Sequence, residues 1–356
     1  MPFQTVLNAN DPQGHWPILI TADQFTRDNL RYLFHEADAM IGHLRDCGGR
    51  LDNWRGPHLQ GEFCLVFMAE PSTRTGLSCA QALINLGARV LYVPDARTSS
   101  SMAKGETDEM MAQMFAQNHP GLVVVRSSNP DTPWVMSNIF ANYPGTNEKK
   151  ERYSIFANAG SGAHEHPTQA LLDAYTIQRL RDGSLDDLNM LVLGDVGLSR
   201  TINSLLRLLS NVTSGLKLII AVPVVDGVKY ELPGHVLDRL RDRGVDFRLE
   251  EVSTHNETVE LARDIEFAYC TRPQVERMGP DLPPDFGRRI SEIVRLTPQM
   301  LDHGLRAFHP LPLTDEIDPD CIGHPNALFI EQASRGLPTR MALFLTMMRH
   351  VEALRQ

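Results

Sequence analysis

Residues 62–86 read EFCLVFMAEPSTRTGLSCAQALINL. The apolar run at the start of this stretch, residues 62–69, predicts a buried strand, and residues 74–86 predict an amphipathic helix. A buried strand that leads directly into such a helix is typical of a parallel sheet covered by helices. The same alternation of short apolar runs and amphipathic stretches continues along the chain, so we predict an α/β fold.

The apolar runs form two series, which predict two doubly wound parallel-sheet domains. Strands of the first series are expected at residues 62–69, 90–94, 122–126 and 154–157, and those of the second at residues 190–194, 216–222, 247–250, 267–270 and 307–309. A long amphipathic run separates the two series. We therefore expect a first domain over residues 1–165, completed by a C-terminal helix at 336–356, and a second domain over residues 166–335.

Composition narrows the class of protein. The chain has 356 residues, 42% hydrophobic and 22% charged, with a mean hydropathy of -0.23, as in soluble globular proteins. A net charge of -10 argues against nucleic acid or an acidic membrane surface as the partner. No apolar run approaches the roughly 18 residues of a membrane span, and the N-terminus has no secretion-signal pattern. The five cysteines form no CxxC pair, which favours reduced thiols in the cytoplasm.

The turn Glu70-Pro71-Ser72-Thr73-Arg74-Thr75 is the strongest local sign of a ligand site. Free backbone N–H groups and the positive end of the helix dipole make such a strand-to-helix junction attractive to an anion. Three hydroxyls and a guanidinium add donors, and a guanidinium binds phosphate in a bidentate way. The alternative is that Ser72 or Thr73 only caps the helix. The sequence contains no GxxxxGK[ST] motif, which disfavours a Walker-type nucleotide site.

A second polar segment, residues 99–107, carries Lys104 among several hydroxyl side chains, including that of Ser100. One interpretation is a solvated loop that ends in a helix cap. The other is a flexible arm that delivers the Lys104 ammonium group to an anion. The residues alone leave both interpretations open.

Three arginines stand at or just after the ends of predicted strands, namely Arg126, Arg200 and Arg272, the last of them followed by Gln274. Ligands of open α/β sheets bind at the carboxyl ends of the strands. Each arginine alone could form a surface ion pair. Three of them at this edge in an acidic protein indicate a substrate with several negative charges.

The segment His164-Glu165-His166-Pro167 could supply metal ligands. No second cluster of ligand residues at suitable spacing supports a metal site, so we expect none. His166 stands at a predicted helix start and is better interpreted as a hydrogen-bond donor that faces the strand ends. In His309-Pro310-Leu311-Pro312 the prolines prevent regular ladder bonds, so this segment can turn backbone carbonyls toward a ligand.

Taken in order along nearly the whole chain, these segments resemble the aspartate/ornithine carbamoyltransferase family. The motifs that carry the resemblance are STRT (72–75), KGET (104–107), Arg126, HPTQALLD (166–173), GDVGLSRT (194–201), TRPQVER (271–277), HPLP (309–312) and DEI (315–317). STRT followed by HPTQ is highly specific to this family. HPLP, where ornithine enzymes have HCLP, favours aspartate as the acceptor when it occurs together with TRxQ.

The resemblance implies a transferase that moves the carbamoyl group of carbamoyl phosphate to the α-amine of L-aspartate. The products would be N-carbamoyl-L-aspartate, an intermediate of pyrimidine biosynthesis, and phosphate. The resemblance implies no cofactor and no metal, and it places the active site in the cleft between the two domains.

The resemblance also assigns roles to individual residues at the carbamoyl phosphate site. His166, with Arg126 and Thr75, would polarise the carbamoyl oxygen, and Gln169 would hold the carbamoyl amine. Arg74 and Lys104 would join these three in catalysis. The full set implied for binding carbamoyl phosphate is Ser72, Thr73, Arg74, Thr75, Ser100, Lys104, Arg126, His166 and Gln169.

For the acceptor, the resemblance implies that Arg200 binds the α-carboxylate of aspartate. Arg272 and Gln274 would bind the side-chain carboxylate, and the backbone at Pro310 and Leu311 would orient the attacking amine. The family equivalents of Ser100 and Lys104 reach into the active site of a neighbouring subunit. A homotrimer with shared sites is therefore implied, which could assemble further with regulatory or dihydroorotase chains.

Two positions depart from the family pattern. Gly76 stands where an arginine usually follows STRT, and Leu313 stands where an arginine usually follows HPLP. These departures leave the acceptor open, so a carbamoyltransferase for another amino acid, such as ornithine, is the main alternative. A catalytically silent homologue that acts as a partner subunit is the other, although such a chain would be expected to have lost site residues that this one retains.

Overall fold

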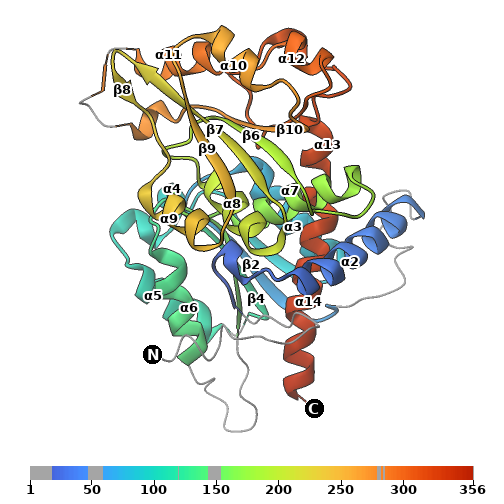
Figure 1. The fold of residues 1–356 in the computed structure, drawn as a ribbon. Coiled ribbons are helices and arrows are strands. Elements are labelled where there is room, and N and C mark those ends of the chain that lie inside the picture. Colours follow the sequence, from blue (N-terminus) through green and yellow to red (C-terminus); the bar gives the residue numbers. More distant parts are fainter. Residues whose placement is uncertain are drawn as a thin grey trace. The chain divides into compact units, whose positions relative to one another are not determined.

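The computed structural model describes residues 18–46, 59–118, 120–142, 154–278, 282–283 and 285–355. Two compact units make up the chain: Met1–Leu171 together with Arg335–Gln356, and Leu172–Ser334. The first division falls inside helix α7 (Pro167–Leu180), whereas the boundary predicted from the sequence lies just before this helix, between residues 165 and 166. Both units are parallel sheets flanked by helices, so the predicted α/β class is confirmed (Figure 1).

The first unit is built on a fully parallel sheet. Its strands lie in the order β1-β5-β4-β2-β3. The four predicted strands are present. The sheet also contains β1, which was not predicted because a strand of two residues is too short to show a sequence pattern. Their bounds are β1 (Ile18–Leu19), β2 (Phe63–Met68), β3 (Arg89–Val93), β4 (Leu122–Ser127) and β5 (Ile155–Ser161).

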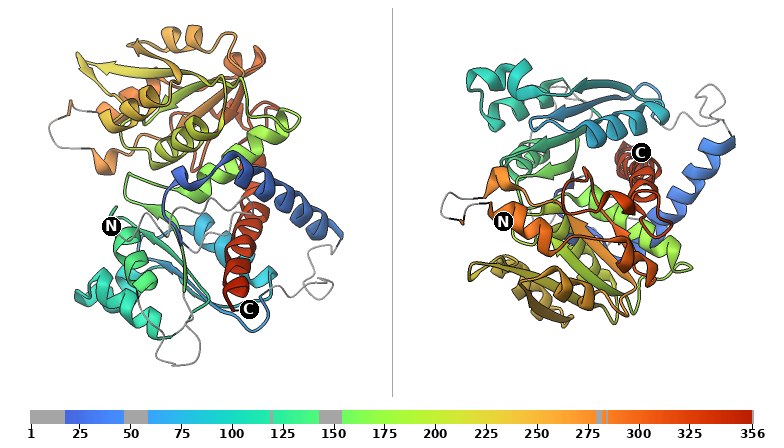
Figure 2. Two further views of the ribbon diagram at one scale, coloured as in Figure 1. Left: turned by 60° about the horizontal axis from the view of Figure 1, so that its bottom comes forward. Right: turned by 90° about the horizontal axis from the view of Figure 1, so that it is seen from above.

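Helices cover both faces of this sheet. They are α2 (Arg27–Asp46), α3 (Thr73–Asn85), α4 (Ala96–Ser99), α5 (Asp108–Gln117), α6 (Thr132–Asn142), the start of α7, and α14 (Gly336–Arg355), with short 3-10 turns η1 (Ala22–Gln24) and η3 (Ser101–Lys104). The C-terminal helix α14 packs against α2 and α3, so the end of the chain completes the unit that its beginning forms (Figure 2).

Apolar side chains of β2, β4 and β5 pack against α5 and α6 in the first core. Phe67 on β2 meets Phe115 on α5 edge to face, with ring centroids 5.0 Å apart. These contacts bury one face of the sheet. Residues on the other face, such as Val66 and Val124, are also buried, which explains why β2 and β4 read as nearly continuous apolar runs.

The strand order brings the ends of β2 and β4 together. The chain winds outward from β2 to β3 on one side and from β4 to β5 on the other, so the sheet changes direction between β2 and β4. The carboxyl ends of strands at such a switch point form the usual ligand crevice of an open α/β sheet. Here the Arg126 carbonyl accepts hydrogen bonds from the N–H groups of Ala69 (2.8 Å) and Glu70 (3.1 Å), which fixes the turn that follows β2.

The second unit contains a sheet with the order β11-β10-β6-β7-β8, and β9 also pairs with β7. Only β8 is antiparallel, joined to β7 by a tight turn at Asp226 and Gly227, both at positive φ. The five predicted strands are present, and the two-residue β8 was not predicted. The bounds are β6 (Asn189–Gly194), β7 (Lys217–Val225), β8 (Val228–Lys229), β9 (Asp246–Val252), β10 (Phe267–Thr271) and β11 (Arg306–Phe308).

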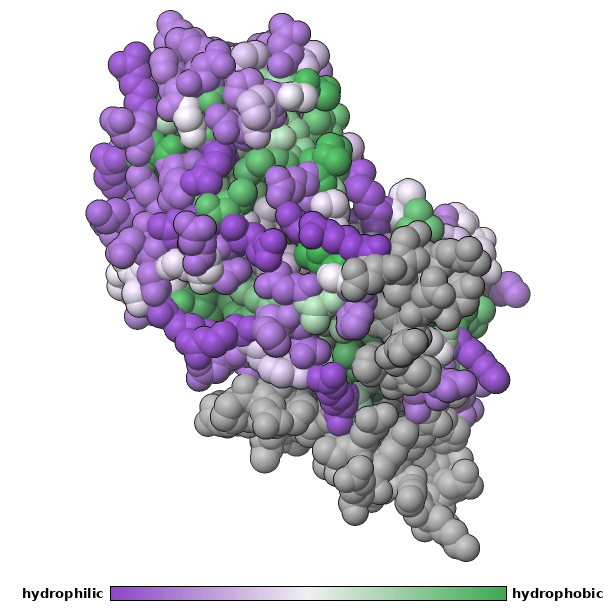
Figure 3. Space-filling view, turned by 90° about the vertical axis from the view of Figure 1, so that its right-hand side faces the viewer, coloured by the Kyte–Doolittle hydropathy of each residue, from purple (hydrophilic) through white to green (hydrophobic). Residues whose placement is uncertain are grey.

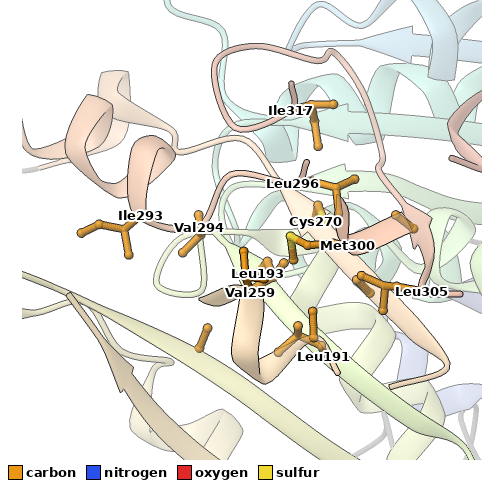
Figure 4. Close-up of a cluster of buried hydrophobic side chains, with 14 of the residues drawn as sticks. Leu191, Leu193, Val259, Cys270, Ile293, Val294, Leu296, Met300, Leu305 and Ile317 are labelled. Carbon is orange, nitrogen blue, oxygen red and sulfur yellow. The ribbon is translucent and has the colours of Figure 1, made fainter. Parts of the chain in front are cut away.

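Helices flank this second sheet, and some of them bury a large apolar cluster against it. They are α8 (Arg200–Val212), α9 (Gly234–Asp242), α10 (His255–Leu261), α11 (Phe286–Ile293), α12 (Pro298–Asp302) and α13 (Phe329–Ser334), with 3-10 turns η4 (Val275–Arg277) and η5 (Pro319–Cys321). Leu191, Leu193 and Cys270 of the central strands meet Ile293 and Met300 in this cluster (Figure 4).

The second sheet changes direction between β6 and β10. At this point Gly194 has a φ of 98°, and a Cβ on it would lie 1.9 Å from the Thr271 carbonyl oxygen. Only glycine therefore lets the two strand ends approach this closely. Asp195, the next residue, donates its backbone N–H to Thr271 Oγ1 at 3.0 Å. The segments that carry Arg200, Arg272 and Gln274 all begin at this switch point.

Hydrophilic side chains predominate on the face drawn in Figure 3. Among the described residues, no helix is both long enough and apolar enough to cross a membrane. The described cysteines Cys64, Cys79, Cys270 and Cys321 are buried, and no disulfide joins any two of them.

Candidate active site

The first turn of α3 presents unused donors at the switch point of the first sheet. Ser72 occupies the N-cap position, but its side chain makes no capping hydrogen bond. In the part of the chain that the structure describes, the backbone N–H groups of Thr73, Arg74 and Thr75 donate to no acceptor. Simple helix capping therefore does not account for this motif, and the helix dipole adds positive potential at the same place.

Arg74 adds a cation to this turn. Its partial burial lowers the pKa of the guanidinium from the ordinary value, although an arginine stays charged at neutral pH. Across the described residues no carboxylate pairs with Arg74. A mostly solvated guanidinium next to free N–H groups is suited to bind an oxyanion such as phosphate.

Arg126 lies at the end of β4, beside the same turn. Its Nη2 donates to Oε1 of Glu70 at 3.1 Å, and the two side chains are 11% and 18% exposed. Because this pair is largely shielded from water, it fixes the direction of the guanidinium more firmly than a surface pair would. The predicted convergence of Arg126 and the STRT turn is therefore seen in the structure.

His166 lies against the same turn from the start of α7. Its Nε2 is 3.4 Å from Oγ1 of Thr75, and its Nδ1 is 3.5 Å from Oγ1 of Thr168. His166, Thr75 and Gln169 are all buried, at 4%, 7% and 9% exposure. The imidazole can thus donate a hydrogen bond at the edge of this turn, as a group that polarises a carbonyl must.

Ser100 and Lys104 lie in a different environment. Ser100 caps η3: its Oγ accepts from the N–H of Met102 at 3.2 Å. Lys104 is exposed, and no hydrogen bond or ion pair joins its ammonium group to any residue that the structure describes. The structure of one chain therefore does not bring these two predicted residues into contact with the α3 turn.

The acceptor-side residues all belong to the second unit. Arg200 is the first residue of α8 and is 7% exposed. Arg272 forms two hydrogen bonds with Glu276, Nη2 to Oε1 at 2.5 Å and Nη1 to Oε2 at 3.1 Å. The Glu276 hydrogen bond raises the pKa of Arg272, and Arg272 lowers the pKa of Glu276.

Asp195 holds several of these second-unit residues in place and was not singled out from the sequence. Its Oδ2 accepts from the backbone N–H of Gln274 at 2.9 Å and from Gln274 Nε2 at 3.0 Å. Its Oδ1 accepts from the Leu198 N–H at 2.8 Å and from the Tyr230 hydroxyl at 2.6 Å. Burial, together with the nearby Asp195 carboxylate, raises the pKa of Tyr230. The sequence did contain a sign of this role: Asp195 is an acidic residue directly after a predicted strand, and arginines were predicted at nearby strand ends.

The HPLP segment is held by buried side chains. The backbone N–H of His309 donates to Gln332 Oε1 at 2.8 Å, and Nδ1 of His309 accepts from the N–H of Leu311 at 2.9 Å. Leu311 has a φ of 63°, which is strained for a branched side chain. No hydrogen bond from the residues that the structure describes reaches the carbonyl oxygen of Pro310 or Leu311, so both remain available to a ligand.

No group of three or more His, Cys, Asp or Glu side chains in the described ranges is arranged to hold a metal ion. Glu165, which lies between His164 and His166, accepts a hydrogen bond from the backbone N–H of Ala22 at 3.3 Å.

Two adjacent matches to one family cover most of the chain. Residues 18–179 match the carbamoyl-phosphate-binding domain of the aspartate/ornithine carbamoyltransferases, and residues 186–347 match their Asp/Orn-binding domain. The chain belongs to the aspartate/ornithine carbamoyltransferase family.

Individual proteins of this family are similar to the chain over most of its length. The chain is 33% identical over 334 residues to the aspartate carbamoyltransferase catalytic subunit of Methanoculleus marisnigri, covering 93% of this chain and 99% of the relative. It is 35% identical over 327 residues to aspartate carbamoyltransferase 2, chloroplastic, of Pisum sativum, covering 91% and 77%. The structure resembles Trypanosoma cruzi aspartate transcarbamoylase in complex with N-(phosphonacetyl)-L-aspartic acid, with a TM-score of 0.76, 27% identity, and coverage of 92% and 95%.

The two departures from the pattern of the aspartate/ornithine carbamoyltransferases have structural explanations. A Cβ on Gly76 would lie 2.2 Å from Oη of Tyr92, so the tyrosine occupies the space where a longer side chain would begin. Burial, with the Cys79 thiol nearby, raises the pKa of Tyr92, which keeps the phenol neutral. Leu313 packs against the apolar cluster of the second unit. Neither position supplies a cation.

Proposed function

We propose that this chain transfers the carbamoyl group of carbamoyl phosphate to the α-amine of L-aspartate, giving N-carbamoyl-L-aspartate and phosphate. The observation that carries the proposal is the first turn of α3, where unused N–H groups, Arg74 and the Thr75–His166 contact meet. Solved relatives from Trypanosoma cruzi in complex with carbamoyl phosphate and aspartate, and with carbamoyl aspartate and phosphate, support the same pair of substrates.

The chemistry requires placement and charge more than a reactive side chain. The aspartate nitrogen attacks the carbamoyl carbon, and the bond from that carbon to the phosphate oxygen breaks with its electron pair going to phosphate. The amine proton leaves with phosphate or solvent. Holding the two reactants in contact can supply about 7–11 kcal/mol of the barrier. Donors at the developing oxyanion typically contribute roughly 100- to 1,000-fold each in rate.

In this proposal the first unit binds carbamoyl phosphate. The N–H groups and hydroxyls of residues 72–75, with Arg74 and Arg126, receive the phosphate oxygens. His166, Thr75 and Arg126 polarise the carbamoyl oxygen, and Gln169 accepts from the carbamoyl amine. The 3.4 Å contact between Thr75 and His166 supports the shared role at one oxygen.

The second unit binds aspartate. Arg200 receives the α-carboxylate, while Arg272 and Gln274 receive the side-chain carboxylate. The bidentate contact with Glu276 is informative, because a substrate carboxylate must compete with it for the same guanidinium face. A cationic acceptor such as ornithine would instead be repelled by Arg272. The free carbonyls of Pro310 and Leu311 would orient the attacking amine.

A homotrimer with shared sites completes the proposal. Lys104 is exposed and has no partner among the described residues, which fits a cation that acts on the site of a neighbouring copy. Buried cysteines that form no disulfide with one another support the cytoplasm as the location.

A product assay tests the function. The purified protein should form the ureido product from carbamoyl phosphate and aspartate, and much less from carbamoyl phosphate and ornithine. Equal or faster turnover of ornithine would show that aspartate is not the preferred acceptor. Absence of product with either amino acid would favour a catalytically silent homologue.

A further inference from the structure

Arg340, on α14, is a buried cation that the proposed mechanism does not use. The residue is 4% exposed, and its Nη2 donates to Oγ1 of Thr168 at 3.4 Å. Over the ranges that the structure describes, no carboxylate pairs with Arg340, and its Nε has no hydrogen-bond partner. Burying a guanidinium without a counter-ion opposes folding strongly. The charge therefore calls for a functional explanation.

The neighbouring thiol does not neutralise this cation. Cys79 on α3 lies beside the Arg340 guanidinium and is fully buried. Burial raises the pKa of the Cys79 thiol, and the opposing effects of Arg340 and Arg126 do not cancel that rise. The thiol therefore stays protonated at neutral pH.

A line of buried side chains leads from Arg340 to the catalytic histidine. Oγ1 of Thr168 is 3.5 Å from Nδ1 of His166, and Nε2 of His166 is 3.4 Å from Oγ1 of Thr75. Thr168 and Arg340 are 0% and 4% exposed, so water does not compete freely for these groups. The contacts are at the long end of the hydrogen-bond range, and all four residues belong to the first unit.

The chemistry of these groups determines which of them donates and which accepts in each hydrogen bond. A guanidinium only donates, so the Thr168 oxygen accepts from Arg340. The single proton of a buried hydroxyl goes to an acceptor when one is in reach. Among the described residues, the one acceptor in reach of the Thr168 hydroxyl is Nδ1 of His166. Nδ1 then carries no proton in the neutral imidazole, and Nε2 carries it.

We propose that Arg340 acts through Thr168 as a positioning residue that holds neutral His166 in its Nε2–H tautomer, with that N–H directed toward Thr75. The consequence for catalysis rests on the proposed function. The Nε2–H tautomer offers a donor to the carbamoyl oxygen as negative charge develops there. The other tautomer would place a lone pair against that charge.

The imidazole nitrogens of His166 report the tautomer directly. Protein labelled with ¹⁵N-histidine is measured without substrates by two-bond ¹H–¹⁵N correlation, and His166 is assigned by comparison with His166→Asn. The wild type should show protonated Nε2 and unprotonated Nδ1. Thr168→Val, which keeps the shape and removes the hydroxyl, should give a mixture of tautomers, and Thr168→Ser should restore the wild-type pattern.

Arg340→Met and Arg340→Lys provide a second matched pair. The methionine variant should mix the tautomers, and the lysine variant should retain Nε2–H. If the methionine variant does not fold, the comparison of Thr168→Val with Thr168→Ser tests the proposal without it. In the product assay, kcat of Thr168→Val should fall roughly 3- to 10-fold, the effect of one hydrogen bond, with little change in KM for carbamoyl phosphate.

A proton on Nδ1 in the wild type would overturn this proposal. So would an unchanged Nε2–H pattern in Thr168→Val. Both spectra are recorded without reaction, so they stand even if the protein proves unable to transfer a carbamoyl group. Failure of the product assay with a normal wild-type spectrum would count against the proposed function alone.

Discussion

The Asp195 carboxylate accepts two hydrogen bonds from Gln274, one from its backbone N–H at 2.9 Å and one from its side-chain amide at 3.0 Å. Gln274 thereby has a fixed position at the carboxyl ends of β6 and β10. The Tyr230 hydroxyl donates to the other carboxyl oxygen, so the proposed aspartate-binding residues of the second unit depend on one buried side chain.

Asp195→Asn should weaken aspartate binding selectively. The asparagine amide would direct N–H groups toward at least one set of donors, so Gln274 or Tyr230 would lose its acceptor. We expect KM for aspartate to rise roughly 10- to 100-fold, the range for hydrogen bonds to a charged group. The measurement is steady-state kinetics in both substrates, with Tyr230→Phe as a control that removes one bond and should have a smaller effect. An unchanged KM for aspartate in Asp195→Asn would show that this network does not position the acceptor site.

Much of the fold could be predicted from apolar runs, because strands buried on both faces, such as β2 and β6, leave a continuous signal. The two-residue strands β1 and β8 leave none. The STRT turn and Arg126 could be placed together, because both follow adjacent parallel strands. The hydrogen bonds between Asp195 and Gln274 could not be predicted, since they join positions far apart in the sequence and depend on the strand order of the second sheet. The packing of Tyr92 over Gly76 likewise depends on how β3 lies beside α3.

Gly76→Ala should disturb the phosphate turn through Tyr92. The new methyl group would meet the phenol at 2.2 Å, so the ring must shift or α3 must move. Overpacking of this kind typically costs about 1–3 kcal/mol. We expect weaker carbamoyl phosphate binding by calorimetry, with most of the loss recovered in the Gly76→Ala, Tyr92→Ala double variant.

Gly234→Ala serves as the control for this substitution, because a Cβ there meets nothing within 4 Å. Additive effects of the Gly76 and Tyr92 changes would indicate that the two residues are not coupled.

Hybrid trimers should test the shared site. Lys104→Ala chains and Arg74→Ala chains should each have little activity, because each lacks one cation for the phosphate. After dissociation and mixing, a hybrid trimer contains some sites with both residues intact, so activity should partly return. The measurement is the product assay on hybrids separated by charge. Hybrids with no activity above that of the parents would place Lys104 outside its neighbour's site.

Glu316 should make the second unit sensitive to acid. Burial alone would raise the pKa of Glu316, but hydrogen bonds from His309 and Thr314 outweigh it and hold that pKa below the ordinary value. A carboxylate with a lowered pKa stabilises the fold above its unfolded pKa of about 4.3, and this contribution is lost as pH falls through the folded pKa.

Glu316→Gln should therefore lower the free energy of unfolding at pH 7, and its difference from the wild type should shrink below about pH 4. Urea unfolding at the two pH values measures this. A difference that stays constant between them would mean that Glu316 does not carry the stabilising charge.

Binding of N-phosphonacetyl-L-aspartate tests the central claim most directly, because this single molecule carries the charges of both substrates. Calorimetry should show one binding event per chain in the wild type. Arg74→Ala and Arg272→Ala, which alter different units, should each weaken binding roughly 10- to 100-fold. Absence of binding to the wild type, or unchanged affinity in either variant, would contradict the proposed roles of Arg74 and Arg272 in binding the two substrates.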